Sequence, residues 1–252
     1  MNGLGVDHAH VVGLSMGAYA ALQFGLRHPQ RVSAIVAAAA GSGSSPSGRH
    51  AWLRETSILA RAFAERGPAT IAEKIATSAA RIQLKYKDPK RWQEFTKQLR
   101  HQSGQGLSNT VIRCQVLRPS LHDLRDQFAT MNTPVLLIVG DEDAACLETN
   151  LMLKATLPNA GLWIAPNTGH TINLEEPAAF NAHLEMFLSA VERRSWRRSY
   201  TTARGTSRRL SLEHKPEAHA PIHVSQERRE ANVISLNQAN RPAGTLPNEL
   251  PP

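Results

Sequence analysis

A serine, two aspartates and a histidine stand out in this sequence because their surroundings could support nucleophilic catalysis. Ser15 is the centre of the pentapeptide Gly13–Gly17, which reads G-L-S-M-G; Asp141 and Asp143 lie in the run G-D-E-D, and His170 ends the run T-G-H. A serine hydroxyl is a poor nucleophile until an imidazole removes its proton, and a carboxylate can hold that imidazole in the required tautomer. If these side chains meet in space, the expected chemistry is acyl transfer from a carbonyl compound.

A tight turn between a strand and a helix explains the glycines on either side of Ser15. The apolar residues before Ser15 predict a strand, and Met16–Arg27 predicts a helix. We expect side chains at Gly13 and Gly17 to collide with neighbouring backbone in such a turn. The turn would expose Ser15 Oγ and place the Met16 backbone N–H at a helix N-terminus, where it can stabilise an oxyanion. The other interpretation is that the glycines only permit close helix packing.

Short apolar runs alternate with helical patterns, which predicts an α/β fold with a mostly parallel sheet of about four strands and flanking helices. The predicted strands are Val11–Leu14, Val32–Ala37, Pro134–Val139 and Leu162–Ile164, and a helix is expected near Leu147–Leu157. Ser15 follows the first strand, both aspartates follow the third, and His170 follows the fourth. Because the carboxyl ends of parallel strands share one edge of a sheet, we expect these side chains to meet there.

The order serine, acid, histidine is that of the α/β-hydrolases. The stretch Ala9–Gly17 resembles the nucleophile elbow of that superfamily, and Thr168–Asn181 resembles its histidine loop and final helix. The resemblance covers about residues 4–191. It implies a truncated α/β-hydrolase fold whose chemistry is that of a capped serine hydrolase.

Residue roles follow from the resemblance. It implies that Ser15 is the nucleophile, that His170 is the general base and that the Met16 N–H belongs to the oxyanion hole. For the acid it implies Asp143, because the family pattern after this strand is Gly-x-x-Asp. Asp141 is the alternative acid. The other interpretation of Asp141 is that it forms a turn or is exposed to solvent.

The chain divides into a core, a cap and a tail. Residues 1–48 and 131–194 are expected to form a partial hydrolase core, and residues 49–130 a helical cap inserted over the active site. Within the cap segment Ser120 is expected to be the N-cap of a helix that runs to Phe128. The apolar periodicity of the last helix stops near Arg194, so we expect a basic, disordered tail over residues 195–252.

Composition limits the classes of partner. Hydrophobic residues make up 41% of the chain, too many for a wholly disordered protein. The net charge is +8, but residues 193–252 hold 11 Lys and Arg against 5 Asp and Glu, so the body is nearly neutral and nucleic acid is not its expected partner. No apolar stretch reaches about 18 residues, which excludes a membrane-spanning helix. No signal peptide is recognised at the start, so we expect a cytoplasmic protein.

No cofactor and no metal is predicted. The Gly/Ser-rich run after the second strand lacks the Gly-Lys-Ser/Thr ending of a phosphate loop. Cys114 and Cys146 do not form a CxxC pair, and we interpret Cys146 as a small buried thiol. His8 and His10 alternate on the first strand without a third ligand at useful spacing.

The sequence departs from the family at its N-terminal end. Only fourteen residues precede Ser15, whereas the family places four strands and two helices before the elbow. We therefore expect a truncated hydrolase with a bare sheet edge and without the second N–H of the oxyanion hole. Loss of one such donor costs on the order of a hundred- to thousandfold in rate, so weak or absent activity is expected.

Two functions remain after these exclusions. The first is a serine hydrolase that acts on a small ester, lactone or related carbonyl substrate, including carbon–carbon cleavage of a diketone-like compound. The alternative is a catalytically inactive hydrolase-like fragment or interaction protein whose basic tail, including Arg193–Arg198, binds anionic surfaces. The substrate and the oligomeric state do not follow from the sequence.

Overall fold

Four parallel strands form one sheet in the described part of the chain, in the order β1-β2-β3-β4. The computed structural model describes residues 1–196. The strands are β1 (Ala9–Leu14), β2 (Val32–Ala38), β3 (Val135–Gly140) and β4 (Ala160–Ala165). This arrangement confirms the predicted α/β fold class. The strands run slightly beyond the apolar runs that predicted them, because the parallel ladder continues largely through alanines and glycines at the strand ends.

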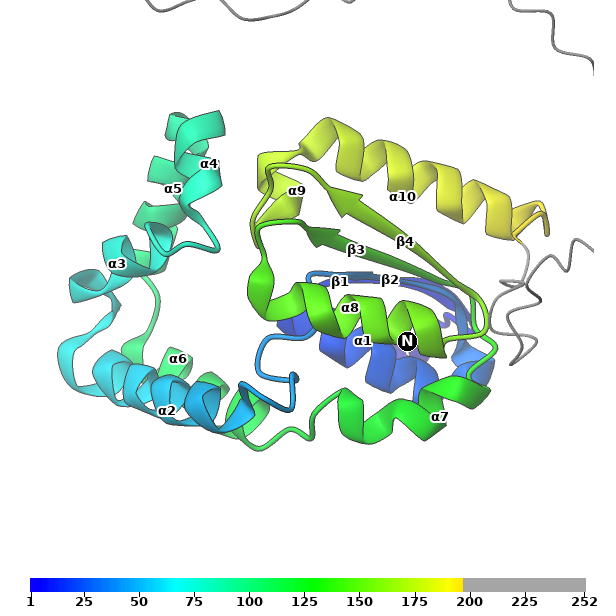
Figure 1. Ribbon diagram of the computed structural model, residues 1–252, viewed down its shortest axis with the longest axis horizontal. Helices are drawn as coiled ribbons and strands as arrows, with labels where there is room; N and C mark the ends of the chain where they lie inside the picture. Colours follow the sequence, from blue (N-terminus) through cyan, green and yellow to red (C-terminus); the bar gives the residue numbers. More distant parts are fainter. Residues whose placement is uncertain (197–252) are drawn as a thin grey trace, which may run out of the picture. The chain divides into compact units, whose positions relative to one another are not determined.

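Helices cover both faces of the sheet (Figure 1). One face carries α1 (Met16–Arg27), α7 (Arg125–Thr130) and α8 (Ala144–Thr156); the other carries α9 (Ile172–Glu175) and α10 (Pro177–Glu192). Neighbouring residues of β3 point to opposite faces of the sheet, and each face has its own apolar core. Leu137 packs with α1 and α8, and Ile138 packs with Phe180 and Phe187 of α10. This alternation is the period of two expected of a strand buried on both faces.

A helical segment lies beyond the carboxyl ends of the strands (Figure 1). It consists of α2 (Arg49–Arg66), α3 (Ala72–Ala76), α4 (Ile82–Lys87), α5 (Pro89–Arg100), α6 (Gly104–Thr110) and a π-helical turn (Val111–Val116). Short 3₁₀ turns occupy Asn2–Leu4, Pro29–Arg31, Pro68–Thr70 and His122–Leu124. The segment has a small apolar cluster of its own, which includes Phe63, Ile71 and Val111. This cluster is separate from the two apolar cores of the sheet.

The chain leaves this segment differently from the prediction. Ser120 does not cap one continuous helix to Phe128: a 3₁₀ turn comes first, and α7 follows it. Ser120 Oγ accepts the His122 N–H at 3.0 Å, while the Asp123 carboxylate accepts the Ser120 N–H at 3.0 Å. These reciprocal bonds close a tight turn. Leu121 and Phe128 then pack into the core beneath the sheet.

The end of the described chain lies against the sheet core. The Trp196 ring meets the Phe187 ring edge-on, with their centroids 4.7 Å apart. The predicted disordered tail lies outside the described residues, apart from Ser195 and Trp196. Among the helices that are described, none is long and apolar enough to cross a membrane.

Candidate active site

Ser15 occupies the turn between β1 and α1 in a backbone conformation that is rare for a residue with a side chain. Its φ is 55° and its ψ is −111°. The Ser15 N–H donates to the Ala38 carbonyl at 2.8 Å, and the Ser15 carbonyl accepts the Tyr19 N–H at 3.0 Å. Strained residues of this kind persist only where the surroundings fix them, and they are frequent at active sites. Strand pairing and the helix together fix this one.

The crowding expected around Ser15 is present at one glycine of the pair and not at the other. A Cβ on Gly13 would lie 2.2 Å from the backbone carbonyl carbon of Gly17, which no real contact tolerates. A Cβ on Gly17 would meet nothing within 4 Å. The prediction is therefore right for Gly13 and wrong for Gly17. The absent side chain of Gly13 lets the first turn of α1 approach β1, whereas Gly17 only supplies the backbone that approaches.

The structure brings together three of the predicted site residues. His170 Nε2 lies 2.8 Å from Ser15 Oγ, and His170 Nδ1 lies 2.7 Å from Asp143 Oδ2. The histidine and aspartate side chains are buried, with exposures of 7% and 1%. When the Nδ1–H donates to the carboxylate, the Nε2 lone pair points at the serine hydroxyl. This arrangement can accept the Ser15 proton.

The fourth predicted residue, Asp141, lies apart from the imidazole. It is exposed, and its Oδ1 accepts the backbone N–H of Thr168 at 3.1 Å. This N–H stabilises the carboxylate and lowers the pKa of Asp141 below its usual value. Asp141 thus joins the loop after β3 to the loop after β4. Asp143 alone reaches the histidine ring, and α8 begins directly after it at Ala144, earlier than the predicted start near Leu147.

A buried glutamate holds the loop that carries His170, and the sequence did not reveal it. Glu175 accepts the N–H of Gly169 at 2.6 Å, and the N–H and hydroxyl of Thr171 at 3.0 and 2.7 Å. The acidic residues Glu175 and Glu176 before Pro177 are typical of the first turn of a helix, which predicts that the last helix begins there. The structure instead ends α9 at Glu175 and starts α10 at Pro177. Glu175 belongs to an acidic pair before a proline, a pattern typical of an exposed helix start.

Gly140 is a second feature that sequence reasoning missed. A Cβ at this position would lie 2.1 Å from the carbonyl oxygen of Thr168 and 2.5 Å from that of Gly169. The absent side chain therefore allows the loops that carry Asp143 and His170 to touch. The pattern Gly-x-x-Asp includes this glycine, but only the packing explains why a glycine is needed there.

The Met16 N–H lies beside Ser15 at the first residue of α1. Among the described hydrogen bonds, none uses this N–H as a donor. The first N–H groups of a helix have no intrahelical acceptor and carry the positive end of the helix dipole. The position is therefore suited to a developing negative charge on an oxygen next to Ser15.

Cys146 lies under the histidine ring. Its Sγ is 3.9 Å from His170 Nδ1 and 3.3 Å from Ser42 Oγ, and burial raises the pKa of the thiol well above its usual value. One ligand atom from each of Asp143, Cys146 and His170 lies within 4.8 Å of the other two. The aspartate and histidine are already bonded to each other, and the thiol is protonated. These residues fit the proton-transfer role better than metal binding, and the expected absence of a cofactor stays a prediction.

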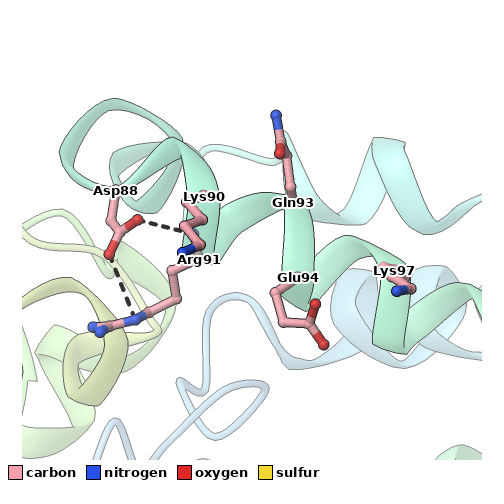
Figure 2. Close-up of a pocket in the computed structure, with 6 residues that line it drawn as sticks. All are labelled: Asp88, Lys90, Arg91, Gln93, Glu94 and Lys97. Atoms are coloured by element: carbon pink, nitrogen blue, oxygen red, sulfur yellow. Dashed lines mark hydrogen bonds and ion pairs between the residues drawn. The ribbon is translucent and has the colours of Figure 1, made fainter.

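A surface hollow along α5 has none of Ser15, Asp143 and His170 in its lining. It is lined by Asp88, Lys90, Arg91, Gln93, Glu94 and Lys97, and Figure 2 shows Asp88 bonded to Arg91. All six side chains are polar or charged, as on an ordinary solvated helix face. The hollow therefore forms no part of the candidate site.

Comparisons with known proteins place this site in context. The sequence pattern of the Alpha/beta hydrolase family matches residues 2–183. A putative carbamate hydrolase, RutD, of Caulobacter sp. (strain K31) is 30% identical over 196 residues, which are 75% of this chain and 68% of the relative. A 2-hydroxy-6-oxo-6-phenylhexa-2,4-dienoate hydrolase of Burkholderia cepacia is 26% identical over 184 residues, covering 72% and 63% of the two chains. The chain thus spans about two thirds of the length of these relatives.

Solved structures share the fold. An esterase from Thermogutta terrifontis superposes with a TM-score of 0.65 at 21% identity, covering 75% of this chain and 68% of the esterase. An enol-lactonase from Burkholderia xenovorans LB400 superposes with a TM-score of 0.62 at 20% identity, covering 75% and 68%. At these identities the likeness concerns the fold.

Proposed function

The chain belongs to the alpha/beta hydrolase family, and on that premise we propose that it is a serine hydrolase of a small ester, lactone or related carbonyl compound. The observation that carries the proposal is the chain of two hydrogen bonds from Ser15 through His170 to Asp143, at 2.8 and 2.7 Å. The names of the relatives, a carbamate hydrolase and a dienoate hydrolase, and of the similar enol-lactonase support hydrolysis as the reaction class.

The proposed reaction has two halves. Ser15 Oγ attacks the carbonyl carbon, its proton moves to His170 Nε2, and the carbonyl electron pair forms an oxyanion that the Met16 N–H stabilises. The C–O bond to the leaving group then breaks as His170 returns the proton to it, leaving an acyl-enzyme. Water attacks that ester with His170 as base, and collapse of the second oxyanion releases the acid and restores Ser15. Asp143 stabilises the imidazolium in both halves.

The helical segment is the proposed cap of this site. Its turn between α3 and α4 touches the histidine loop, because the Ala80 carbonyl accepts the His170 N–H at 2.6 Å. A cap in this place would shield the acyl-enzyme and shape the pocket for the substrate. The expectation of low turnover stays a prediction, and the kcat of the purified chain tests it.

Covalent labelling tests the proposed nucleophile. A fluorophosphonate probe should label the wild-type protein on Ser15, and Ser15→Ala should abolish the label. Labelling of Ser15→Ala at the wild-type rate would show that another residue is the nucleophile.

A matched pair of aspartate variants tests the proposed acid. Asp143→Asn should lower kcat by about four orders of magnitude, because the amide holds the wrong histidine tautomer. Asp141→Asn should keep most of kcat, since its carboxylate contacts only loop backbone. Loss of activity in Asp141→Asn alone would reverse the two assignments.

A further inference from the structure

One arginine of the helical segment lies next to the residue that contacts the histidine loop. The Ala80 carbonyl accepts the His170 N–H at 2.6 Å, and a Cβ on Gly169 would lie 2.5 Å from the same oxygen. The turn that contains Ala80 therefore packs directly on the backbone of the His170 loop. Arg81 is the next residue, so its side chain starts beside the proposed general base.

The Arg81 side chain is partly buried and has no bonded partner among the described residues. Within that part of the chain, no acceptor lies within hydrogen-bond distance of its guanidinium, and no carboxylate lies within ion-pair distance. Burial lowers the pKa of Arg81, and the negative charges of Asp143 and Glu175 oppose this shift. Both carboxylates lie beside His170 or its loop, in the floor of the candidate site.

Neither carboxylate of that floor pairs with Arg81. Asp143 Oδ2 is bonded to His170, and Asp143 Oδ1 has no donor within reach among the described residues. Glu175 already accepts three hydrogen bonds from Gly169 and Thr171. A guanidinium offers five N–H donors in a fork that matches a carboxylate. A partly desolvated guanidinium without an anion is costly, and a ligand carboxylate would remove that cost.

The other partly buried arginines of the helical segment, Arg49 and Arg91, do have partners, as does the exposed Arg100. Arg49 donates to two backbone carbonyls, Arg91 pairs with Asp88 and donates to the Leu174 carbonyl, and Arg100 lies 3.4 Å from a Glu73 oxygen. Arg81 differs from them in lying towards the proposed catalytic residues without a described acceptor. Its donors are therefore available to a ligand that binds beside the His170 loop.

We propose that Arg81 binds a carboxylate group of the substrate, so that the site accepts carbonyl compounds carrying a negative charge away from the bond to be broken. This inference rests on the proposed function for the bond that is cleaved. It adds the substrate class, an anionic monoester or an equivalent keto or lactone acid.

A binding experiment tests the carboxylate site without any turnover. Ser15→Ala protein is titrated calorimetrically with the monomethyl esters of succinate, glutarate, adipate and suberate, and with the dimethyl ester of each. The best monoester should bind at least about tenfold more tightly than its dimethyl ester, as expected for charge-assisted hydrogen bonds. Adding Arg81→Gln should abolish that preference.

Arg61→Gln is the matched control, because Arg61 is an exposed arginine of α2 and the change removes the same charge. The Ser15→Ala/Arg61→Gln protein should keep the preference for the monoester. A preference that survives Arg81→Gln, or no preference in any of the four pairs, would overturn the inference. Thermal melting of each variant verifies folding, and Arg81→Gln should fold because its guanidinium makes none of the described bonds.

Kinetics with Ser15 intact separate this inference from the proposed function. Arg81→Gln should lower the ratio of kcat/KM for the best monoester to that for its dimethyl ester by about ten- to a hundredfold. An equal loss on both esters would assign Arg81 to the electrostatics of the triad instead and overturn the inference. If Ser15 is never labelled but the binding preference is present and needs Arg81, the hydrolase proposal fails and the carboxylate site stands.

Discussion

The helical segment is attached to the sheet in two regions that differ in how they are built. The first region, here called the hinge, comprises residues 41–49 and 117–121, where the chain enters and leaves the segment. The second, here called the arm contact, is where α4 and α5 meet the loops that carry Asp143 and His170. The hinge has a buried centre at Ser44, Arg118 and Ser120, and its donors reach backbone carbonyls, whereas the arm contact consists largely of long side chains near solvent.

Arg118 is the centre of the hinge. Its guanidinium lies 4.6 Å from the Tyr19 ring centroid and 5.7 Å from that of Trp52, and it donates to the Ser42 carbonyl at 2.8 Å. Arg49 donates to the Arg118 carbonyl at 2.6 Å. These contacts join α1 and α2 to both chain segments of the hinge, and two aromatic rings lie beside the guanidinium.

The arm contact uses weaker partners. Lys87 lies 2.6 Å from Glu176 and 3.1 Å from Thr168 Oγ1, and Gln83 donates to Glu142 at 2.7 Å. Partly exposed ion pairs of this kind are weakened by salt, while hydrogen bonds out of water keep their strength. The difference predicts that the side chains of the arm contact contribute less to stability than those of the hinge. Substitutions in the hinge and in the arm contact test that contrast, and one at Asp141 tests the bond between the two loops that receive the arm contact. They follow from the largest expected effect to the smallest.

Arg118→Ala should lower the free energy of unfolding by about 3 kcal/mol, since it removes a cation between two rings and leaves a buried carbonyl without its donor. Urea denaturation followed by circular dichroism measures this change. Arg118→Met should recover part of the loss, because it fills the space and because Nη1 of Arg118 has no described partner. If Arg118→Ala changes the free energy of unfolding by less than about 0.5 kcal/mol, the hinge is not the stronger attachment.

Ser120→Ala should cost about 1–3 kcal/mol of the free energy of unfolding, because the buried Ser44 carbonyl loses its 2.6 Å donor. Ser44 Oγ accepts the Leu121 N–H at 3.2 Å, so Ser44→Ala removes a neighbouring bond. A double-mutant cycle should show that the two changes are coupled. Additive effects would mean that the two hydrogen bonds stabilise the hinge independently of each other.

Asp141→Asn should destabilise the protein less than either hinge substitution, and the effect should depend on pH. The pKa of Asp141 is lowered in the folded state, so its contribution is present above the ordinary carboxyl pKa of about 3.9 and is lost as the pH falls through the folded value. The difference in melting temperature between wild type and variant should therefore be largest near neutral pH and vanish in strong acid. A difference that grows on acidification would contradict the lowered pKa.

Lys87→Met should cost less than about 1 kcal/mol in dilute buffer, and nothing measurable at roughly 1 M salt, where the screening length is only about 3 Å. Lys97→Met on the exposed side of α5 is the control for loss of a lysine. Salt should leave the hinge variants unchanged. A large cost of Lys87→Met that persists at high salt would show that both attachments are equally firm.

The sequence predicted the elements that depend on local pattern. Apolar runs located the four strands, and the turns after three of them predicted that Ser15, Asp143 and His170 lie at one edge of the sheet. The sequence did not predict the burial of Arg118 or Glu175, because each is a charged residue in a polar stretch and becomes buried only through partners far along the chain. The contact of Lys87 was missed for the same reason. Periodicity reports which face of an element is apolar, and it carries no signal for a polar side chain that is paired across the fold.

The closeness of the two loops at Gly140 has an evolutionary consequence. This position has no functional group, so a replacement by alanine would leave every proposed catalytic atom in the chain. The added methyl would nevertheless overlap the Thr168 carbonyl and would push the imidazole away from its alcohol. A single glycine-to-alanine substitution at a position without a catalytic group could therefore abolish the proposed activity. A sequence comparison restricted to the serine, aspartate and histidine would still find all three residues.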